Sequence, residues 1–212
     1  MVTTSTGSPT PQRSRLPLVL IVLICLAPVL FALLAYYVPS LGLRPDNTNN
    51  YGTLVDPQRP VPAPQALSLT TLEGQPFDLA SLHGKWILIS ADQAACPESC
   101  VKKLFILRNS HASQGKNVER LSRVWFITDA DSVPDEQILE AYKGTNMLRV
   151  DPAQLVAWLA PQASPDQIDA ALKAPMWIVD PLGNLMMQFP ADADPISVRN
   201  DITKLLKNSQ IG

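Results

Sequence analysis

The sequence predicts a mixed α/β domain, with a central sheet flanked by helices, behind one N-terminal transmembrane helix. Residues 16–38 form 23 consecutive residues without a charge, and such a run is long enough to span the hydrocarbon core of a bilayer. After residue 66, short apolar runs typical of strands alternate with amphipathic runs of helical spacing. This alternation is the order expected of an α/β domain.

The N-terminal apolar run is predicted to be an anchor that remains in the membrane. Residues 1–15 are rich in Ser, Thr and Pro, and they carry Arg13 and Arg15 but no acid, so we expect a disordered tail. Arginines before the run, with no comparable cluster just after it, predict a cytoplasmic N-terminus and a periplasmic or otherwise extracytoplasmic domain. The run is too long for a cleaved signal peptide, and its alanines form no A-x-A cleavage site.

A linker and one domain are predicted to follow the anchor. Residues 39–65 are rich in Pro and Asn and are expected to be a linker, within which residues 51–55 are apolar enough to pack back onto the domain. Residues 66–212 are expected to form the domain. All 19 acids and 15 of the 17 basic residues lie after the anchor, which gives that part a formal charge of −4. With no basic patch, we expect no nucleic acid partner.

Hydrophobic periodicity predicts the elements of this domain in order. The expected elements are a hairpin over 67–79, a strand at 86–89, a helix from 97 to about 115, a strand at 124–127, a helix at 134–142, a strand at 147–150, helices at 152–159 and 165–172, a hairpin over 176–189 and a helix at 195–206. Strands that alternate with helices, closed by a hairpin and a helix, are the order of a thioredoxin-like fold.

The stretch 85–103 carries the chemistry of the domain. Its apolar strand runs into Cys96-Pro-Glu-Ser-Cys100 and then into an amphipathic helix. Pro97 suits the first turn of that helix, which places Cys96 at or just before the helix N-terminus. Four residues correspond to about 400° of rotation, so the two thiols lie about 40° apart on one helix face with Cα atoms about 6 Å apart. A disulfide spans this distance.

The position of the two cysteines favours a reactive pair. The helix dipole, with Lys102 and Lys103, is expected to favour the thiolate form of Cys96. Cys96 is therefore predicted to be the more exposed, attacking thiol and Cys100 the resolving one. The alternative is a static structural disulfide or two buried thiols. The first sulfur lies at the carboxyl end of a strand, where open α/β sheets keep their active sites.

The segment from Gly84 to Cys100 resembles the Sco family, whose members are membrane-anchored, thioredoxin-fold proteins that help to build the copper centre of cytochrome c oxidase. The turn Asp180-Pro-Leu-Gly183 is also Sco-like, and the order of elements matches over roughly 66–206. The resemblance implies a role in oxidase assembly by thiol–disulfide exchange, by Cu(I) transfer, or both, with an oxidase subunit as partner. A general thiol–disulfide oxidoreductase that acts on exported thiol proteins, and a binding module without redox cycling, remain alternatives.

The histidine that the Sco family uses as a copper ligand is absent from the corresponding segment, residues 171–176. His83 precedes the central strand, which must rise about 20 Å to the motif, and His111 lies about 16 Å beyond Cys100 along the helix. Neither is expected to reach the sulfurs. We therefore expect the two cysteines to bind Cu(I) alone, with Met176 as a further candidate ligand, and to form no stable Cu(II) site.

The segment Ala174 to Asp180 resembles the region of thioredoxin-like reductases in which a cis-proline opens the penultimate strand. The resemblance implies that Pro175 is a cis-proline that faces the disulfide and the incoming substrate. Pro lacks a donor for the strand ladder, so the first residue of a strand tolerates it. An ordinary trans-proline at a strand start is the alternative.

Overall fold

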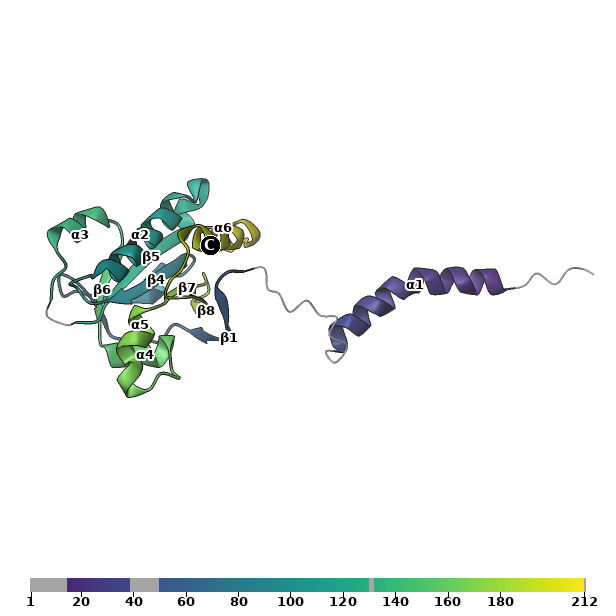
Figure 1. Ribbon diagram of the computed structural model, residues 1–212, viewed down its shortest axis with the longest axis horizontal. Helices are drawn as coiled ribbons and strands as arrows, with labels where there is room; N and C mark the ends of the chain where they lie inside the picture. Colours follow the sequence, from purple (N-terminus) through teal and green to yellow (C-terminus); the bar gives the residue numbers. More distant parts are fainter. Residues whose placement is uncertain (1–14, 39–49, 130–131, 212) are drawn as a thin grey trace, which may run out of the picture. The chain divides into compact units, whose positions relative to one another are not determined.

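The computed structural model describes residues 15–38, 50–129 and 132–211 (Figure 1). The chain divides into one unit that ends at residue 49 and a compact unit from Asn50 to Gly212. The predicted tail, apart from Arg15, lies outside the described residues, and so do residues 39–49 of the predicted linker.

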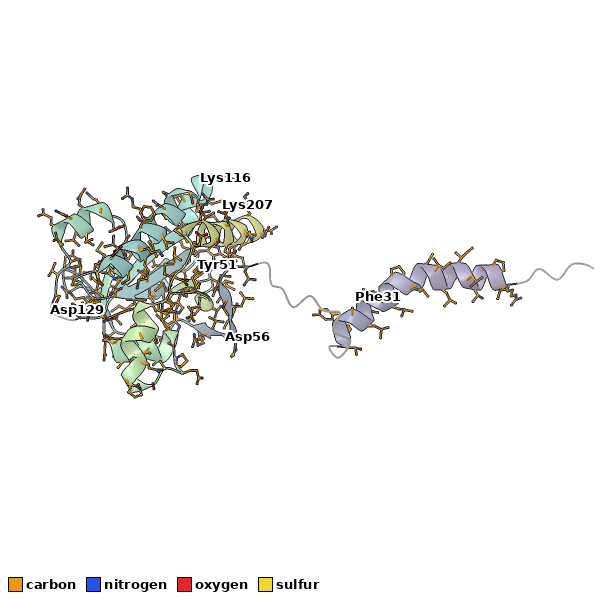
Figure 2. All side chains as sticks on the ribbon, in the orientation of Figure 1. Phe31, Tyr51, Asp56, Lys116, Asp129 and Lys207 are labelled. Carbon is orange, nitrogen blue, oxygen red and sulfur yellow. A yellow bond between two sulfur atoms is a disulfide. The ribbon has the colours of Figure 1, made fainter. Side chains whose placement is uncertain are left out.

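The first unit contains α1, Leu16–Tyr37, a helix of 22 residues with no charged side chain. In the part of the chain that the structure describes, it is the one helix long and apolar enough to cross a membrane. None of its side chains is buried, and they project on all sides of the helix (Figure 2). The helix agrees with the anchor predicted at 16–38 and is consistent with single-pass attachment to a membrane.

The compact unit is built on a mixed sheet of eight strands in the order β1-β8-β7-β4-β5-β6-β2-β3. The strands are β1 Thr53–Pro60, β2 Leu69–Thr71, β3 Pro76–Phe77, β4 Trp86–Asp92, β5 Leu121–Ile127, β6 Asn146–Val150, β7 Met176–Val179 and β8 Asn184–Phe189. β4 pairs in parallel with β5 and antiparallel with β7. β4 is a central strand whose side chains pack into buried clusters on both faces of the sheet, and every one of its residues is buried.

Helices cover both faces of this sheet (Figure 1). The helices of the compact unit are α2 Glu98–Ala112, α3 Glu136–Ala141, α4 Pro152–Leu159, α5 Ile168–Lys173 and α6 Pro195–Asn208, with 3₁₀ turns at Leu79–Leu82, Gly115–Arg120 and Pro165–Gln167. α2 and α6 contribute to one buried cluster, and α4 and α5 contribute to the other. The predicted sheet flanked by helices is confirmed.

Alternation along the strands divides the core into these two clusters. In β4, Leu88 faces the α2 side while Ile87 and Ile89 face the α4 side. Trp125 of β5 and Trp177 of β7 lie in opposite clusters and are both fully buried. This alternation follows from the period of two residues in a strand.

The compact unit begins earlier than the sequence predicted. β1, which lies within the range assigned to the linker, pairs antiparallel with β8. The buried carboxylate of Asp201 accepts hydrogen bonds from the backbone N–H groups of Tyr51, at 2.6 Å, and Gly52, at 2.9 Å. A Cβ at Gly52 would lie 2.6 Å from Sδ of Met187, so any larger residue would displace that side chain. Residues 50–60 of the predicted linker are therefore held in the compact unit by contacts far along the chain, including residues 51–55, which were expected to pack back onto the domain.

Candidate functional site

β4 and α2 position the cysteine motif between them. The backbone N–H of Cys96 donates to the carbonyl of Gln93 at 3.0 Å, which turns the chain after β4. Cys96 has φ 41°, in the left-handed region that residues with a Cβ rarely adopt. Pro97 is the N-cap of α2 and not a residue of its first turn as predicted. Cys96 therefore lies just before the helix, and Cys100 lies within the first turn.

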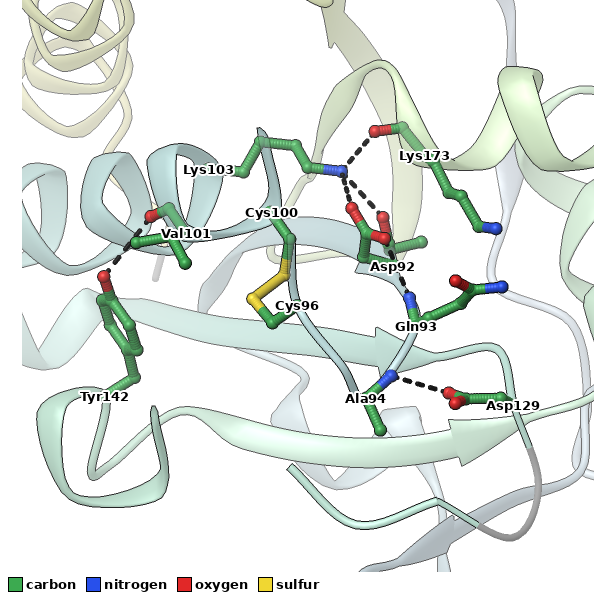
Figure 3. Close-up of a disulfide and its surroundings, with 11 residues drawn as sticks. Asp92, Gln93, Ala94, Cys96, Cys100, Val101, Lys103, Asp129, Tyr142 and Lys173 are labelled. Atoms are coloured by element: carbon green, nitrogen blue, oxygen red, sulfur yellow. Dashed lines mark hydrogen bonds and ion pairs between the residues drawn. A yellow bond between two sulfur atoms is a disulfide. The ribbon is translucent and has the colours of Figure 1, made fainter. Parts of the chain in front are cut away.

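The two cysteines form a disulfide (Figure 3). Their Cα atoms are 5.0 Å apart, close to the spacing expected from the helix geometry. Both side chains belong to the buried cluster beneath α2, with 5% of Cys96 and 1% of Cys100 exposed. The attacking role of Cys96 and the resolving role of Cys100 remain predictions.

The N-terminus of α2 is suited to a thiolate. The N-cap Pro97 makes no side-chain hydrogen bond to the helix, and the first backbone N–H groups of an α-helix have no acceptor within the helix. These groups and the helix dipole favour a negative charge at this end. A thiolate at Cys96, immediately before the cap, would be such a charge.

A buried ion pair lies on one side of the disulfide (Figure 3). Nζ of Lys103 lies 3.0 Å from the carboxylate of Asp92, and the two side chains are 5% and 2% exposed. The same ammonium donates to the carbonyl of Ala91 at 2.8 Å and to the carbonyl of Lys173. The pair therefore ties the end of β4 to the first half of α2 and to the end of α5.

Burial lowers the pKa of Lys103, and the nearby carboxylate of Asp92 acts in the opposite direction. The charge of Lys103 is thus balanced by a buried partner. This corrects the expectation that Lys103 helps Lys102 to favour a thiolate at Cys96, because a cation that is paired with a carboxylate contributes little net field. Lys102 is exposed.

Different contacts hold the opposite side of the disulfide. There, the hydroxyl of Tyr142 donates to the carbonyl of Val101 at 3.3 Å. Away from Tyr142, in the turn after β4, the N–H of Ala94 donates to the carboxylate of Asp129 at 2.7 Å. Tyr142 packs in the same buried cluster as both cysteines. Figure 3 shows the disulfide between Tyr142 on one side and the Asp92–Lys103 pair on the other.

The two histidines lie away from the motif, as expected. His83 precedes β4 at the end opposite the cysteines, and its ring lies against Gly183 in the β7–β8 turn. His111 lies in the last turn of α2. Among the described residues, no group of three or more His, Cys, Asp or Glu side chains could hold a metal ion.

The expected cis bond at Pro175 is not present. Within the described residues, the only cis peptide bond is Asp56–Pro57. Ala174 is the C-cap of α5 and has helical dihedral angles, so the chain enters β7 directly from the helix through a trans bond. Pro175 and Met176 are both buried, and Met176 lies opposite Ser90 of β4.

Asp92, Lys103 and Tyr142 were not predicted as site residues. Asp92 was given no role from the sequence, and Lys103 was treated only as a cation near Cys96. The spacing of Lys103 held a signal, since it falls three residues after Cys100 and four before Leu107, on the face that α2 buries. A lysine on a buried helix face requires a buried partner.

The sheet order, with a cysteine pair between the central strand and the following helix, defines a protein of the thioredoxin-like class. Residues 86–209 match the family model described as "Transmembrane-like, thioredoxin-like, C-terminal domain". The match covers more than half of the chain, and the chain belongs to this family. A comparison with curated proteins finds no match.

Solved structures with the same fold include Sco proteins and a thiol:disulfide interchange protein. BsSco, "a member of the Sco family of cytochrome c oxidase assembly proteins", is 13% identical with a TM-score of 0.51, over 74% of this chain and 99% of that one. Copper-bound ScoI of Arabidopsis thaliana is 15% identical with a TM-score of 0.50, over 75% and 99%. The interchange protein from Bacteroides sp. is 16% identical with a TM-score of 0.51, over 72% and 91%. At identities this low, the structural similarity establishes a shared fold alone.

Proposed function

We propose that this protein is a membrane-anchored, extracytoplasmic thiol–disulfide exchange protein that acts in cytochrome c oxidase assembly through Cys96 and Cys100. The observation that carries the proposal is the disulfide between these residues, at the carboxyl end of β4 and the N-terminus of α2. A helix N-terminus stabilises the thiolate that such exchange requires. The tether is α1.

The exchange proceeds in two displacements. In the reduced protein, the Cys96 thiolate attacks one sulfur of a partner disulfide and forms a mixed disulfide, while the other partner sulfur leaves as a thiolate and takes a proton. The Cys100 thiolate then attacks Cys96 Sγ and releases the second partner thiol. The protein dithiol is oxidised to the Cys96–Cys100 disulfide, and the partner disulfide is reduced to a dithiol, with two electrons transferred.

The Sco-like motif supports an oxidase subunit as the partner. Cys96-Pro-Glu-Ser-Cys100 and the Asp180–Gly183 turn resemble Sco proteins, and the fold is that of BsSco. A general oxidoreductase for exported proteins is the alternative, and the equal likeness in fold to the Bacteroides interchange protein supports it. A binding module that has lost redox cycling would keep the same fold.

Cu(I) is the second candidate cargo of the same pair. The two sulfurs lie together in an apolar cluster, and soft thiolates suit Cu(I). A Cu(II) site would need a nitrogen ligand. His83 precedes β4, whose far end leads to the cysteines, and His111 lies in the last turn of α2. Met176 packs in the same cluster as the cysteines and remains the thioether candidate.

One paired measurement tests this proposal. The full-length chain in detergent micelles, equilibrated in glutathione buffers, should titrate reversibly between dithiol and disulfide. A reduction potential below about −300 mV would indicate a static structural disulfide instead.

Copper binding is measured on the reduced chain without oxygen. The reduced chain should bind at most one Cu(I), and the Cys96→Ser/Cys100→Ser variant should bind none. Cu(II) should give no lasting thiolate charge-transfer band, whereas Lys173→His should introduce one. A strong, lasting band in the unchanged protein would favour copper storage over exchange.

The proposed orientation is tested separately. Arg13 and Arg15 precede α1, and no comparable cluster of basic residues follows it closely. We therefore expect the N-terminus in the cytoplasm and the compact unit outside it. A reporter enzyme that functions only after export, fused behind Gly212, should be active. Activity confined to a cytoplasm-only reporter at the same position would contradict this orientation.

A further inference from the structure

A groove of about 550 Å³ lies beside the cysteine motif, along the outer side of α2. It is lined by Glu98, Ser99, Val101, Lys102, Phe105 and Tyr142, and we call it the Phe105 groove. Five of these residues come from α2, and Tyr142 follows α3. Because Ser99 lies between the two cysteines in the sequence, the groove begins at the motif itself.

Phe105 has no role in the core that explains its presence. The compact unit has four phenylalanines, and Phe105 is the only exposed one, with 50% of its surface exposed. The side of α2 that packs on the sheet carries Cys100, Leu104 and Leu107. Phe105 lies outside that face and shares a hollow with Val101 and Tyr142, and an apolar groove on the surface is a feature of binding sites.

Tyr142 forms the floor of the groove and packs against the disulfide site. Tyr142 is 7% exposed and packs in the same buried cluster as Cys96 and Cys100. Its hydroxyl is already used by the carbonyl of Val101. The ring therefore offers an apolar surface that is held in place before any ligand arrives.

The rim of the groove selects against charged ligands. Glu98 and Lys102 are exposed, opposite in charge and one turn apart on α2. Their fields largely cancel, so neither an anion nor a cation is attracted to the groove. The remaining lining favours an apolar side chain from a segment with little net charge.

The length of α2 sets the spacing of such a side chain from the reacting sulfur. Phe105 lies seven residues into the helix from Glu98, which corresponds to about 10 Å along the axis. An extended chain covers this distance in about three residues. A partner cysteine at Cys96 would therefore place the third residue from it beside Phe105.

We propose that the Phe105 groove binds an apolar side chain about three residues from the reacting cysteine of an extended partner polypeptide. This inference rests on the proposed disulfide exchange and adds a rule for choosing the partner. Small disulfides such as glutathione disulfide, which do not reach Phe105, should react without using the groove.

The test compares two synthetic peptides that differ in one residue. Each carries a cysteine in mixed disulfide with glutathione, and the third residue from it is Leu in one peptide and Ser in the other. The reduced full-length chain with Cys25→Ser, in detergent micelles, converts each to peptide thiol and glutathione while Cys96 and Cys100 are oxidised. We expect the Leu peptide to react about tenfold faster, the scale of discrimination by one small apolar pocket.

Three variants test whether the preference for the Leu peptide depends on Phe105. Phe105→Ser should abolish it without changing the rate with glutathione disulfide, and Phe105→Leu should retain it. Leu182→Ser is the matched control, because Leu182 is exposed at 65% on the β7–β8 turn, at the other end of the sheet, and it should leave the preference unchanged.

The outcomes separate this inference from the proposed function. Equal rates for the two peptides would overturn the groove and leave exchange intact. An equal loss with peptides and glutathione disulfide in Phe105→Ser would also overturn it, since the residue would then act only on the structure. No reaction with any of the three disulfides would overturn the proposed exchange and the groove together.

Discussion

Replacing Lys103 by Met is expected to destabilise the compact unit by about 3–5 kcal/mol, because removal of one partner leaves the other as an uncompensated buried charge. Asp92 would be that charge, since its side chain is 2% exposed beside Lys103. Asp92→Asn should have a similar effect by leaving the ammonium unpaired. The double variant Asp92→Asn/Lys103→Met leaves no buried charge and should recover most of the loss.

The measurement is urea unfolding of the oxidised full-length chain, followed by tryptophan fluorescence. All four tryptophans lie in the compact unit and are buried, so the signal does not report on α1. Lys173→Met is the matched control, since it removes an ion pair with Asp169, whose side chain is 70% exposed. Exposed pairs contribute about 0–1 kcal/mol. Equal losses in the control and in Lys103→Met would contradict the role of the buried pair.

Much of the fold was predictable because local patterns agree with tertiary structure. Leu88 and Ile89 lie in an apolar run that became the central strand, and the spacing of Leu104 and Leu107 marked the helix that covers it. The CPESC motif located the cysteines because its geometry is local to one helical turn. Such features depend on few residues beyond their own neighbours.

Other features depend on contacts that no local pattern shows. β1 contains Pro57 and Pro60 and lacks regular alternation, and the position of its start depends on Asp201, about 150 residues later in the chain. Pro175 could not be assigned as cis or trans, because the isomer is set by how α5 leads into β7.

The Asp92–Lys103 pair was missed for a similar reason. The spacing of Lys103 places it on the buried face of α2, but Asp92 closes a strand and nothing in its local sequence identifies it as the partner of Lys103. Only the packing of α2 on β4 brings their side chains together away from solvent. The sequence pattern of a single helix or strand cannot reveal an ion pair between residues of two different elements.

The order of attack is the second large expected effect. If Cys96 attacks and Cys100 resolves, Cys100→Ser should accumulate mixed disulfides with partner proteins, because the step that releases the partner is lost. Cys96→Ser should accumulate none, since the attacking sulfur is gone. Both variants should carry Cys25→Ser, because Cys25 is a free, exposed cysteine in α1.

Non-reducing electrophoresis of cells that express these variants tests the central claim most directly. The account predicts higher-mass species of the protein in Cys100→Ser that disappear on reduction and are absent from Cys96→Ser and from the double cysteine variant. Mixed disulfides found in Cys96→Ser but not in Cys100→Ser would show that Cys100 attacks and Cys96 resolves. The absence of such species from every variant would contradict disulfide exchange with partner proteins.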